Sequence, residues 1–419
     1  MSACLINLED TIRLAEWIPY HYTTLPLTGL VIALDPNNSQ QGINRTLNLI
    51  DLWKDKIEIT LWPDYFLSED KRFRSGNGST RASTNSQQRQ NNKPQNYVRE
   101  RQVYFANRCL AYHQSKNRSW TLLTDNDEYL VFNYKHDDEK VKYDHPGAKK
   151  ARVKNKIDRD REFYMPLRND LPAQNASTVL QYIQKQQNIL LVSSKKSSTN
   201  QTSKANINNT ITTVSNDNDT PFLPTCVRLP GIHYGGDRGV NQSFVESNEW
   251  PFGNTNTHDD DDIHTDTIDP ALFSTLRDIH HAKRNSKFSK VMVDVSRVPS
   301  NTFDWNPSNA NHAKTIHNPS RICGYNGKYD SGADYYSSLF RLNHYLGSLE
   351  SYLERKADYR SRSIETYAKK AQKVDVTKNA HLWDRDVVSW VAVFVQSLEG
   401  GTEEAKSLLA PIARYVNAA

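Results

Sequence analysis

The first 64 residues alternate short apolar runs with segments of helical periodicity, and this alternation restricts the fold more than any other feature of the chain. The runs "ACLINL", "GLVIALDP" and "KIEITLWPD" have the length and the Ile, Leu and Val content of buried strands. Residues 9–25 and 42–55, which lie between them, carry apolar side chains at helical spacing. Strands joined by helices of this length form right-handed β-α-β units, so the sequence predicts an α/β fold with a mainly parallel sheet.

The same unit recurs after a polar stretch, residues 68–96, which we predict to be a mobile loop. Helical periodicity resumes at Tyr97 and leads into "SWTLLTDNDEYLVFN", in which a hydrophobic run meets Asp125, Asp127 and Glu128 before a second hydrophobic run begins. Burying unpaired carboxylates is costly. The acidic triplet must therefore lie at an exposed strand end, pair with cations, or bind a metal.

The later sequence continues the same domain. We predict strands in "TCVRLPGIHYGG", "KFSKVMVDVSRV" and "AKTIHNPS", polar loops over residues 193–220 and 254–269, and a charged helix over 349–373. Two further helices close the chain, the first of them strongly apolar. This gives one domain over residues 1–373, with the helices of 374–419 packed on it.

Composition excludes some classes of function. The net charge of +5 is small against 53 basic and 48 acidic residues, and no basic stripe with interleaved aromatic residues is evident, so nucleic acid is not the expected partner. Four widely spaced cysteines without a CxxC pair disfavour a zinc ribbon and leave room for one or two disulfides. No stretch approaches the roughly 18 consecutive apolar residues of a membrane span.

The location of the protein is suggested by two other features. Nine Asn-x-Ser/Thr sequons favour a secretory lumen. The first predicted strand begins at about Cys4, which is an abrupt start, and we therefore expect a membrane anchor upstream that is missing from this sequence.

Position distinguishes the acidic triplet from the other DxD patterns of the chain. Only Asp125 and Asp127 directly follow a strand of the predicted sheet, and ligands of open α/β sheets bind beyond the carboxyl ends of the strands. Asp35 and Asp64 end the second and third strands, which places carboxylates at three strand ends along one edge. Oxygen ligands of this kind suit Mn²⁺ or Mg²⁺ and a diphosphate. The alternative is that these aspartates only cap turns.

Several blocks of the sequence resemble the family 92 (DUF23-like) glycosyltransferases. The resemblance rests on a Glu-Trp pair in the first helix, a Gln and a Cys in the helix before the acidic strand, and an Asp-x-Asp-Glu motif. The matching residues here are Glu16, Trp17, Gln102, Cys109, Asp125, Asp127 and Glu128. The later segments "KVMVDVSRV", "TIHNPS" and "LNHYLGSLESYLERK" follow in family order, and the blocks together cover about half the chain.

The resemblance implies a GT-A (Rossmann-like) fold and an inverting, metal-dependent hexosyltransferase. The enzyme would use a UDP-sugar donor, with galactose as the expected hexose, and a glycan or glycoprotein acceptor in the Golgi or secretory lumen. Asp125 and Asp127 would hold Mn²⁺ or Mg²⁺, and His317 or His344 would complete its shell. Asp35, with Asp64 and Gln102, would contribute to the nucleotide site, and membrane contact would come only through the missing anchor.

The catalytic base is not evident from the sequence. Inversion needs a carboxylate that deprotonates the acceptor hydroxyl, and Asp237 and Glu128 are the two candidates. Tyr234 and Trp250 are candidates for stacking on sugar rings.

Two other classes of function remain open. One is a catalytically silent carbohydrate- or calcium-binding protein that uses the acidic triplet as Ca²⁺ ligands. The other is a metal-dependent phosphoryl-transfer enzyme or nuclease, for which the sequence offers no phosphate loop or basic groove.

Overall fold

The computed structural model describes residues 1–7, 10–25, 27–35, 38–62, 93–132, 226–235, 250–252, 268–278, 289–303, 340–346, 364–371, 387 and 389–417. The strands are β1 (Ser2–Asn7), β2 (Gly29–Leu34), β3 (Glu58–Trp62), β4 (Trp120–Leu123), β5 (Glu128–Phe132), β6 (Cys226–Tyr234), β7 (Ser289–Asp294) and β8 (Phe340–Tyr345). The helices are α1 (Thr11–Thr24), α2 (Gln40–Trp53), α5 (Lys93–Ser115), α10 (Ser274–Arg277), α13 (Ile364–Ala371), α15 (Trp390–Ser397) and α16 (Gly401–Asn417). Short 3₁₀ turns lie at η2 (Pro270–Leu272), η3 (Val295–Arg297) and η4 (Ser300–Phe303).

The N-terminal half has the β-α-β organisation that its sequence predicts. β1, β2, β3 and β4 pair in parallel, with β1 between β2 and β4. All six residues of β2 are buried, as expected of a parallel strand with both faces covered. Ser39 begins α2, because its side chain accepts a hydrogen bond from the amide of Gly42 at 3.1 Å.

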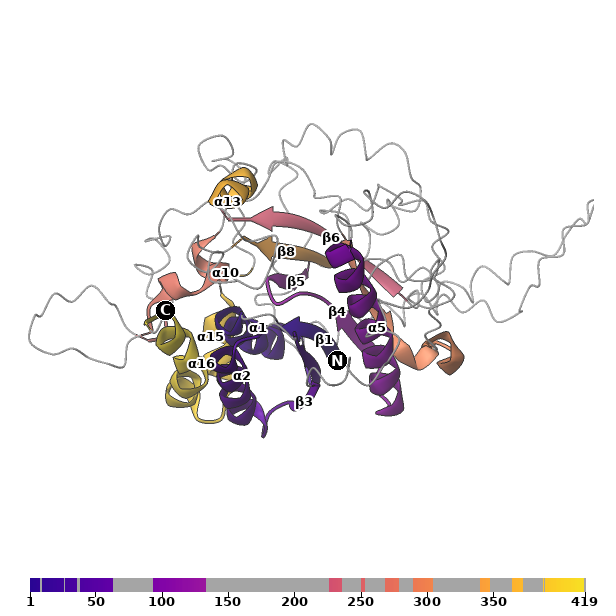
Figure 1. Ribbon diagram of the computed structural model, residues 1–419. Helices are drawn as coiled ribbons and strands as arrows, with labels where there is room; N and C mark the ends of the chain where they lie inside the picture. The colour runs from indigo at the N-terminus through magenta and orange to yellow at the C-terminus, as the bar shows by residue number, and fades with distance from the viewer. Residues whose placement is uncertain are drawn as a thin grey trace, which may run out of the picture.

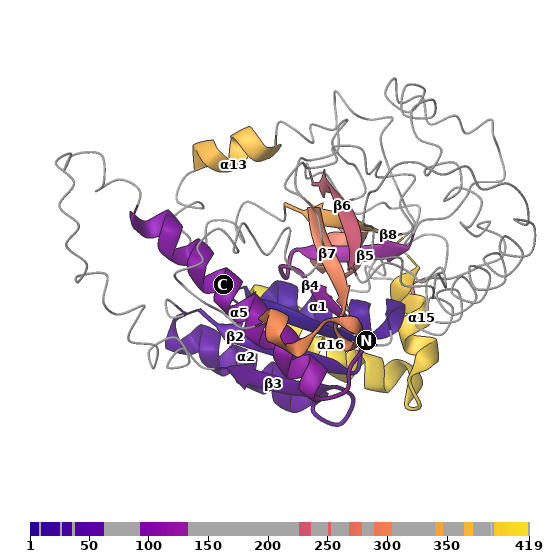
Figure 2. The same ribbon diagram turned by 90° about the vertical axis from the view of Figure 1, so that its right-hand side faces the viewer.

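The sheet order is β3-β2-β1-β4-β7-β6-β8-β5, so the acidic triplet lies where the chain passes from β4 in the middle of the sheet to β5 at its edge. β7 pairs antiparallel with β4 and β6, β6 pairs in parallel with β8, and β5 pairs antiparallel with β8 at the end of the order. β4 and β5 are therefore consecutive in the chain but not neighbours in the sheet. Figures 1 and 2 both place β5, β6 and β8 together, away from β3. The architecture is a Rossmann-like α/β fold with a mainly parallel sheet, as predicted.

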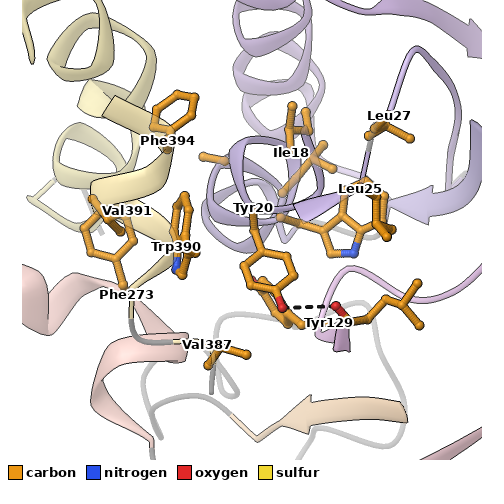
Figure 3. Close-up of a cluster of buried hydrophobic side chains, with 14 of the residues drawn as sticks. Ile18, Tyr20, Leu25, Leu27, Tyr129, Phe273, Val387, Trp390, Val391 and Phe394 are labelled. Carbon is orange, nitrogen blue, oxygen red and sulfur yellow. Dashed lines mark hydrogen bonds between the residues drawn. The ribbon is translucent and has the colours of Figure 1, made fainter. Parts of the chain in front are cut away.

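Alternation along β1 divides the core between the two faces of the sheet. Ala3 and Leu5 pack in the larger cluster with α1, α2, α15 and α16, whereas Cys4 packs in a second cluster with α5. Figure 1 shows the same division, with α1, α2, α15 and α16 on one side of the strands and α5 on the other. The C-terminal helices thus pack directly against α1, and Figure 3 shows Trp390 of α15 beside Tyr20 of α1.

Helix α1 completes the hydrogen bonding of β5 along the edge that β8 does not cover. Trp17 Nε1 donates to the carbonyl of Glu128 at 3.0 Å, and the Tyr20 hydroxyl donates to the carbonyl of Leu130 at 3.0 Å. The latter bond is the dashed line of Figure 3. The amide of Leu130 donates to His21 Nε2 at 3.2 Å. Side chains of one helix thereby satisfy backbone groups that a neighbouring strand would otherwise bind.

Some predicted boundaries differ from the structure. Helix α5 begins at Lys93, inside the predicted loop of 68–96. The end predicted for the loop of 254–269 agrees with the structure, because the Asp269 side chain accepts from the amide of Ala271 at 2.7 Å and caps η2, which begins at Pro270. Of the helix predicted over 349–373, the described part is Ile364–Ala371. The strand predicted in "AKTIHNPS" and the loop predicted over 193–220 lie outside the described residues.

Candidate functional site

The acidic triplet lies in and directly after the tight turn that joins β4 to β5. The amide of Glu128 donates to the carbonyl of Asp125 at 3.2 Å and closes the turn. Asn126 points inward, and its Nδ2 donates to Asn7 Oδ1 at 3.3 Å and to the carbonyl of Asp10 at 3.1 Å. The central residue of the turn is thus fixed to the end of β1, which leaves Asp125 and Asp127 on either side of it.

Asp125 and Glu128 share one buried lysine. Lys290, on β7, is fully buried, and its Nζ lies 2.8 Å from Asp125 Oδ2 and 3.2 Å from Glu128 Oε2. Glu128 Oε2 also accepts from Thr124 Oγ1 at 3.0 Å and from the Asp125 amide at 3.1 Å. The Asp125 side chain is 43% exposed and that of Glu128 is 3% exposed. The Asp125 carboxylate therefore reaches solvent, whereas the buried Glu128 carboxylate accepts hydrogen bonds from residues of the turn.

Asp127 is held by a different pair of basic groups. Arg13 Nη1 of α1 lies 3.0 Å from Asp127 Oδ2, and His344 Nε2 of β8 lies 3.1 Å from the same oxygen. Arg13 Nη2 also donates to the carbonyl of Leu346 at 2.6 Å, which ties α1 to the end of β8. The side chains of Asp127 and His344 are 14% and 26% exposed, so this pair is accessible from one side.

Electrostatics in this cluster follow from burial and from close charges. Burial alone would lower the pKa of Lys290, but the carboxylates of Asp125 and Glu128 together outweigh it and raise the pKa above its ordinary value. For His344, burial also lowers the pKa, and the nearby Asp127 carboxylate reverses the shift so that the pKa is raised. Burial raises the pKa of Glu128, and Lys290 opposes that rise.

Asp35 lies on the same edge of the sheet as the acidic turn. Its amide donates to the carbonyl of Asn7 at 2.9 Å, and Asn7 Oδ1 accepts from Asn126. The ends of β1, β2 and β4 are therefore linked through Asn7. This is the arrangement that the alignment of strand ends predicts for Asp35 and Asp125.

Other predicted residues lie elsewhere. Gln102 is half-buried on α5, which packs against the opposite face of the sheet from α1. Tyr234 and Trp250 are 1% and 6% exposed, and Trp250 Nε1 donates to the carbonyl of Ile268 at 3.0 Å. Both aromatic residues belong to the hydrophobic core, so the prediction that they stack on sugar rings is not supported. Asp64, Asp237 and His317 lie outside the described residues.

Burial also argues against one of the two predicted bases. A general base must reach the proton that it removes, yet Glu128 is 2% exposed and its carboxylate already accepts from Lys290, Thr124 and the Asp125 amide. The geometry favours a positioning role for Glu128.

Reasoning from the sequence missed three residues of this cluster, Arg13, Lys290 and His233. Arg13 and Lys290 each carried a weak signal, since each is a basic residue directly before apolar residues of a predicted helix or strand. His233 of β6 pairs in register with His344, and the two rings lie 4.7 Å apart between centroids. No local sequence pattern predicts that contact, because it depends on the parallel pairing of β6 with β8.

The comparisons with known proteins identify no family. No protein-family model matches the chain, and no curated protein or solved structure matches it.

A second group of metal-binding atoms is accounted for by a disulfide. One ligand atom from each of Cys4, Cys109 and His113 lies within 4.8 Å of the other two. Cys4 and Cys109 form a disulfide that joins β1 to α5, so neither sulfur is available as a thiolate ligand. Cys226 is disulfide-bonded as well. This group therefore fits a structural cross-link.

The acidic turn has the donor chemistry of a divalent cation site. Asp127 and His344 offer a carboxylate oxygen and an imidazole nitrogen close together, and Asp125 adds a solvent-exposed carboxylate. A cation at Asp127 would share that carboxylate with Arg13. Asp127 and His344 are donor types that suit Mn²⁺ or Mg²⁺. Within the described residues, Asp125 does not form a group with this pair in which all three ligand atoms lie within 4.8 Å of one another.

Proposed function

We propose that this chain is a metal-dependent glycosyltransferase of the family 92 type with a GT-A-like fold. It would transfer a hexose, with galactose as the expected sugar, from a UDP-sugar to a glycan or glycoprotein acceptor with inversion. The observation that carries the proposal is the Asp127–His344 pair, with the exposed Asp125 in the same turn, at the strand-end edge that also contains Asp35. Ligand sites of open α/β folds lie at this edge.

The roles of Asp125, Asp127 and His344 are proposed from their exposure and partners, and that of Asp35, which is 8% exposed, from its position at a strand end. Asp125, Asp127 and His344 would hold Mn²⁺ or Mg²⁺, which supplies charge neutralisation for a leaving diphosphate. Asp35, at the end of β2, would contact the nucleoside. Arg13 and Lys290 orient the carboxylates and limit the negative charge of the cluster. Asp237 stays the predicted catalytic base, which would remove the proton from the hydroxyl of the acceptor.

Residence in the secretory pathway is part of the proposal. Disulfides persist in oxidising compartments and are rare in the cytosol. The buried Cys4–Cys109 disulfide and the disulfide-bonded Cys226 support such a compartment, together with the sequons. Within the described residues, no helix combines the length and the apolar character needed to cross a bilayer.

The test is release of UDP from a panel of nucleotide sugars, with and without Mn²⁺, by the parent and by Asp127→Ala. We expect Mn²⁺-dependent release by the parent and its loss in the variant. Asp51→Ala is the matched control, because Asp51 is an exposed aspartate of α2 whose only described ion pair is with the exposed Lys54. This control should release UDP at the parental rate.

Other outcomes favour the alternatives. Retained glycan or Ca²⁺ binding without turnover would favour a silent binding protein on the same fold. Cleavage of a phosphodiester would favour phosphoryl-transfer or nuclease chemistry by the same carboxylates.

A further inference from the structure

Asp125 is restrained at both its backbone and its side chain by one buried ion pair. Glu128 Oε2 accepts the Asp125 amide at 3.1 Å, and Lys290 Nζ contacts Asp125 Oδ2 at 2.8 Å. Lys290 and Glu128 contact each other at 3.2 Å and are almost fully buried. We call Lys290 and Glu128 the buried clamp.

The buried clamp costs free energy, although the turn does not need a buried ion pair in order to form. A turn between two strands can be closed by its backbone hydrogen bond, which is present here from Glu128 to Asp125. Burying an ammonium and a carboxylate carries a large desolvation penalty, and a well-packed apolar pair of similar size is often at least as stable. Stability alone therefore does not account for a fully buried lysine behind an exposed carboxylate.

The geometry of the clamp suits a ligand carboxylate. The buried Lys290 side chain extends from β7 to one oxygen of Asp125, while the Asp125 side chain remains 43% exposed. Fixing one oxygen and the backbone amide sets the direction in which the carboxylate meets solvent. Carboxylates that bind metals are themselves hydrogen-bonded, and such partners tune the affinity for the metal.

We infer that Lys290 and Glu128 are positioning residues that preset Asp125 to bind a divalent cation. The inference rests on the proposed function, since it assigns a purpose to the clamp only if Asp125 is a cation ligand. It adds that the affinity of the site depends on two buried residues that would not touch the cation.

The decisive variant is Lys290→Met combined with Glu128→Met. It removes one ammonium and one carboxylate together, so the net charge around Asp125 stays the same. We expect folding to be retained, judged from the urea midpoint. The dissociation constant for Mn²⁺, measured by electron paramagnetic resonance, should rise by about 10- to 100-fold. Hydrogen exchange of the peptide that contains Asp125 should also accelerate, because its amide loses the Glu128 acceptor.

Two further variants complete the design. Lys54→Met with Asp51→Asn removes an exposed ion pair of comparable length, 2.9 Å, and should change neither Mn²⁺ affinity nor exchange. If the double Met variant does not fold, Lys290→Met with Glu128→Gln replaces it. This variant keeps an acceptor oxygen for the Asp125 amide, so we expect preserved amide protection with weakened Mn²⁺ binding.

The outcomes separate the two proposals. Parental Mn²⁺ affinity in a folded clamp variant, alongside loss of binding in Asp127→Ala, overturns the clamp and leaves the cation site standing. A parent chain that binds no Mn²⁺, or binds it equally in Asp127→Ala, overturns the cation site and with it the proposed purpose of the clamp.

Discussion

His21 shows how a single buried side chain can make the fold sensitive to acid. The Leu130 amide donates to His21 Nε2, so the ring proton must be on Nδ1, which donates to the carbonyl of Trp17 at 2.9 Å. Burial lowers the pKa of His21 to about 3. Burial likewise lowers the pKa of His113 to about 4, and His113 Nε2 donates to the carbonyl of Ala3 at 3.1 Å. Both rings are neutral in the folded chain at neutral pH.

The stability of the protein should therefore fall as the pH falls from 6.5. The unfolded chain binds protons at both histidines below that value, whereas the folded chain resists doing so until about pH 4 for His113 and about pH 3 for His21. Each histidine contributes a slope of about 1.4 kcal/mol per pH unit in this window. Urea unfolding at pH 7, 6, 5 and 4 measures the slope.

His21→Gln with His113→Gln serves as the comparison for that experiment. Glutamine can accept and donate hydrogen bonds but does not titrate, so the variant should lose the slope that His21 and His113 contribute. Equal slopes for the parent and the variant would contradict the assignment of neutral, buried histidines.

At the scale of elements, two of the helices are fixed to the sheet by specific bonds rather than by apolar packing alone. α1 covers the open edge of β5 through Trp17, Tyr20 and His21. α5 is joined to β1 by the Cys4–Cys109 disulfide, with a sequence separation of 105. These bonds fix both helices relative to the strand ends that carry the acidic turn.

Removing the disulfide should destabilise the whole sheet. We expect Cys4→Ala with Cys109→Ala to lose about 2 to 4 kcal/mol of unfolding free energy, because closing so long a loop restricts the unfolded chain. Urea unfolding with and without reductant measures this. Reductant should destabilise the parent more than the variant, in which only the disulfide of Cys226 remains to be reduced. An unchanged urea midpoint in the variant would show that the cross-link contributes nothing.

At the scale of the whole molecule, the C-terminal helices share the core of the sheet domain. Phe394 of α15 stacks on Trp53 of α2 and contacts Tyr22 of α1 edge-on, at centroid distances of 6.1 and 6.5 Å. Glu16 of α1 accepts hydrogen bonds from the amides of Ser274 and Thr275, and Trp390 Nε1 donates to Thr275 Oγ1. α15 is therefore connected to α1 by both apolar and polar contacts.

This shared core predicts one cooperative unfolding transition. Phe394→Ala should cost about 3 to 5 kcal/mol through lost burial and a residual cavity, and it should shift the entire urea transition. Leu47→Ala is the control, since Leu47 is 45% exposed on α2 and its truncation should change stability little. A variant that unfolds in two steps, with the second at the parental midpoint, would instead indicate that the C-terminal helices form a separate unit.

Sequence predicts this molecule best where structure is local. The strand and helix periodicity of the first 64 residues yields the parallel β-α-β units and places Asp35 and Asp125 on one edge. The periodicity does not predict the position of β5, because β5 resembles a continuation of β4 in the sequence. The strand with which β5 pairs, β8, lies more than 200 residues further along the chain. Arg13 and Lys290 were missed for the same reason, since their partners are distant in sequence.

The separation of β4 from β5 in the sheet also sets an order for biosynthesis. The strands β1 to β4 can pair once the first third of the chain has left the ribosome. Lys290 is 165 residues beyond Asp125, and the Leu346 carbonyl is 333 residues beyond Arg13. During translation, the nascent protein must therefore carry its acidic turn without these partners until most of its length has emerged, and the contacts that hold the turn form only near the end of synthesis.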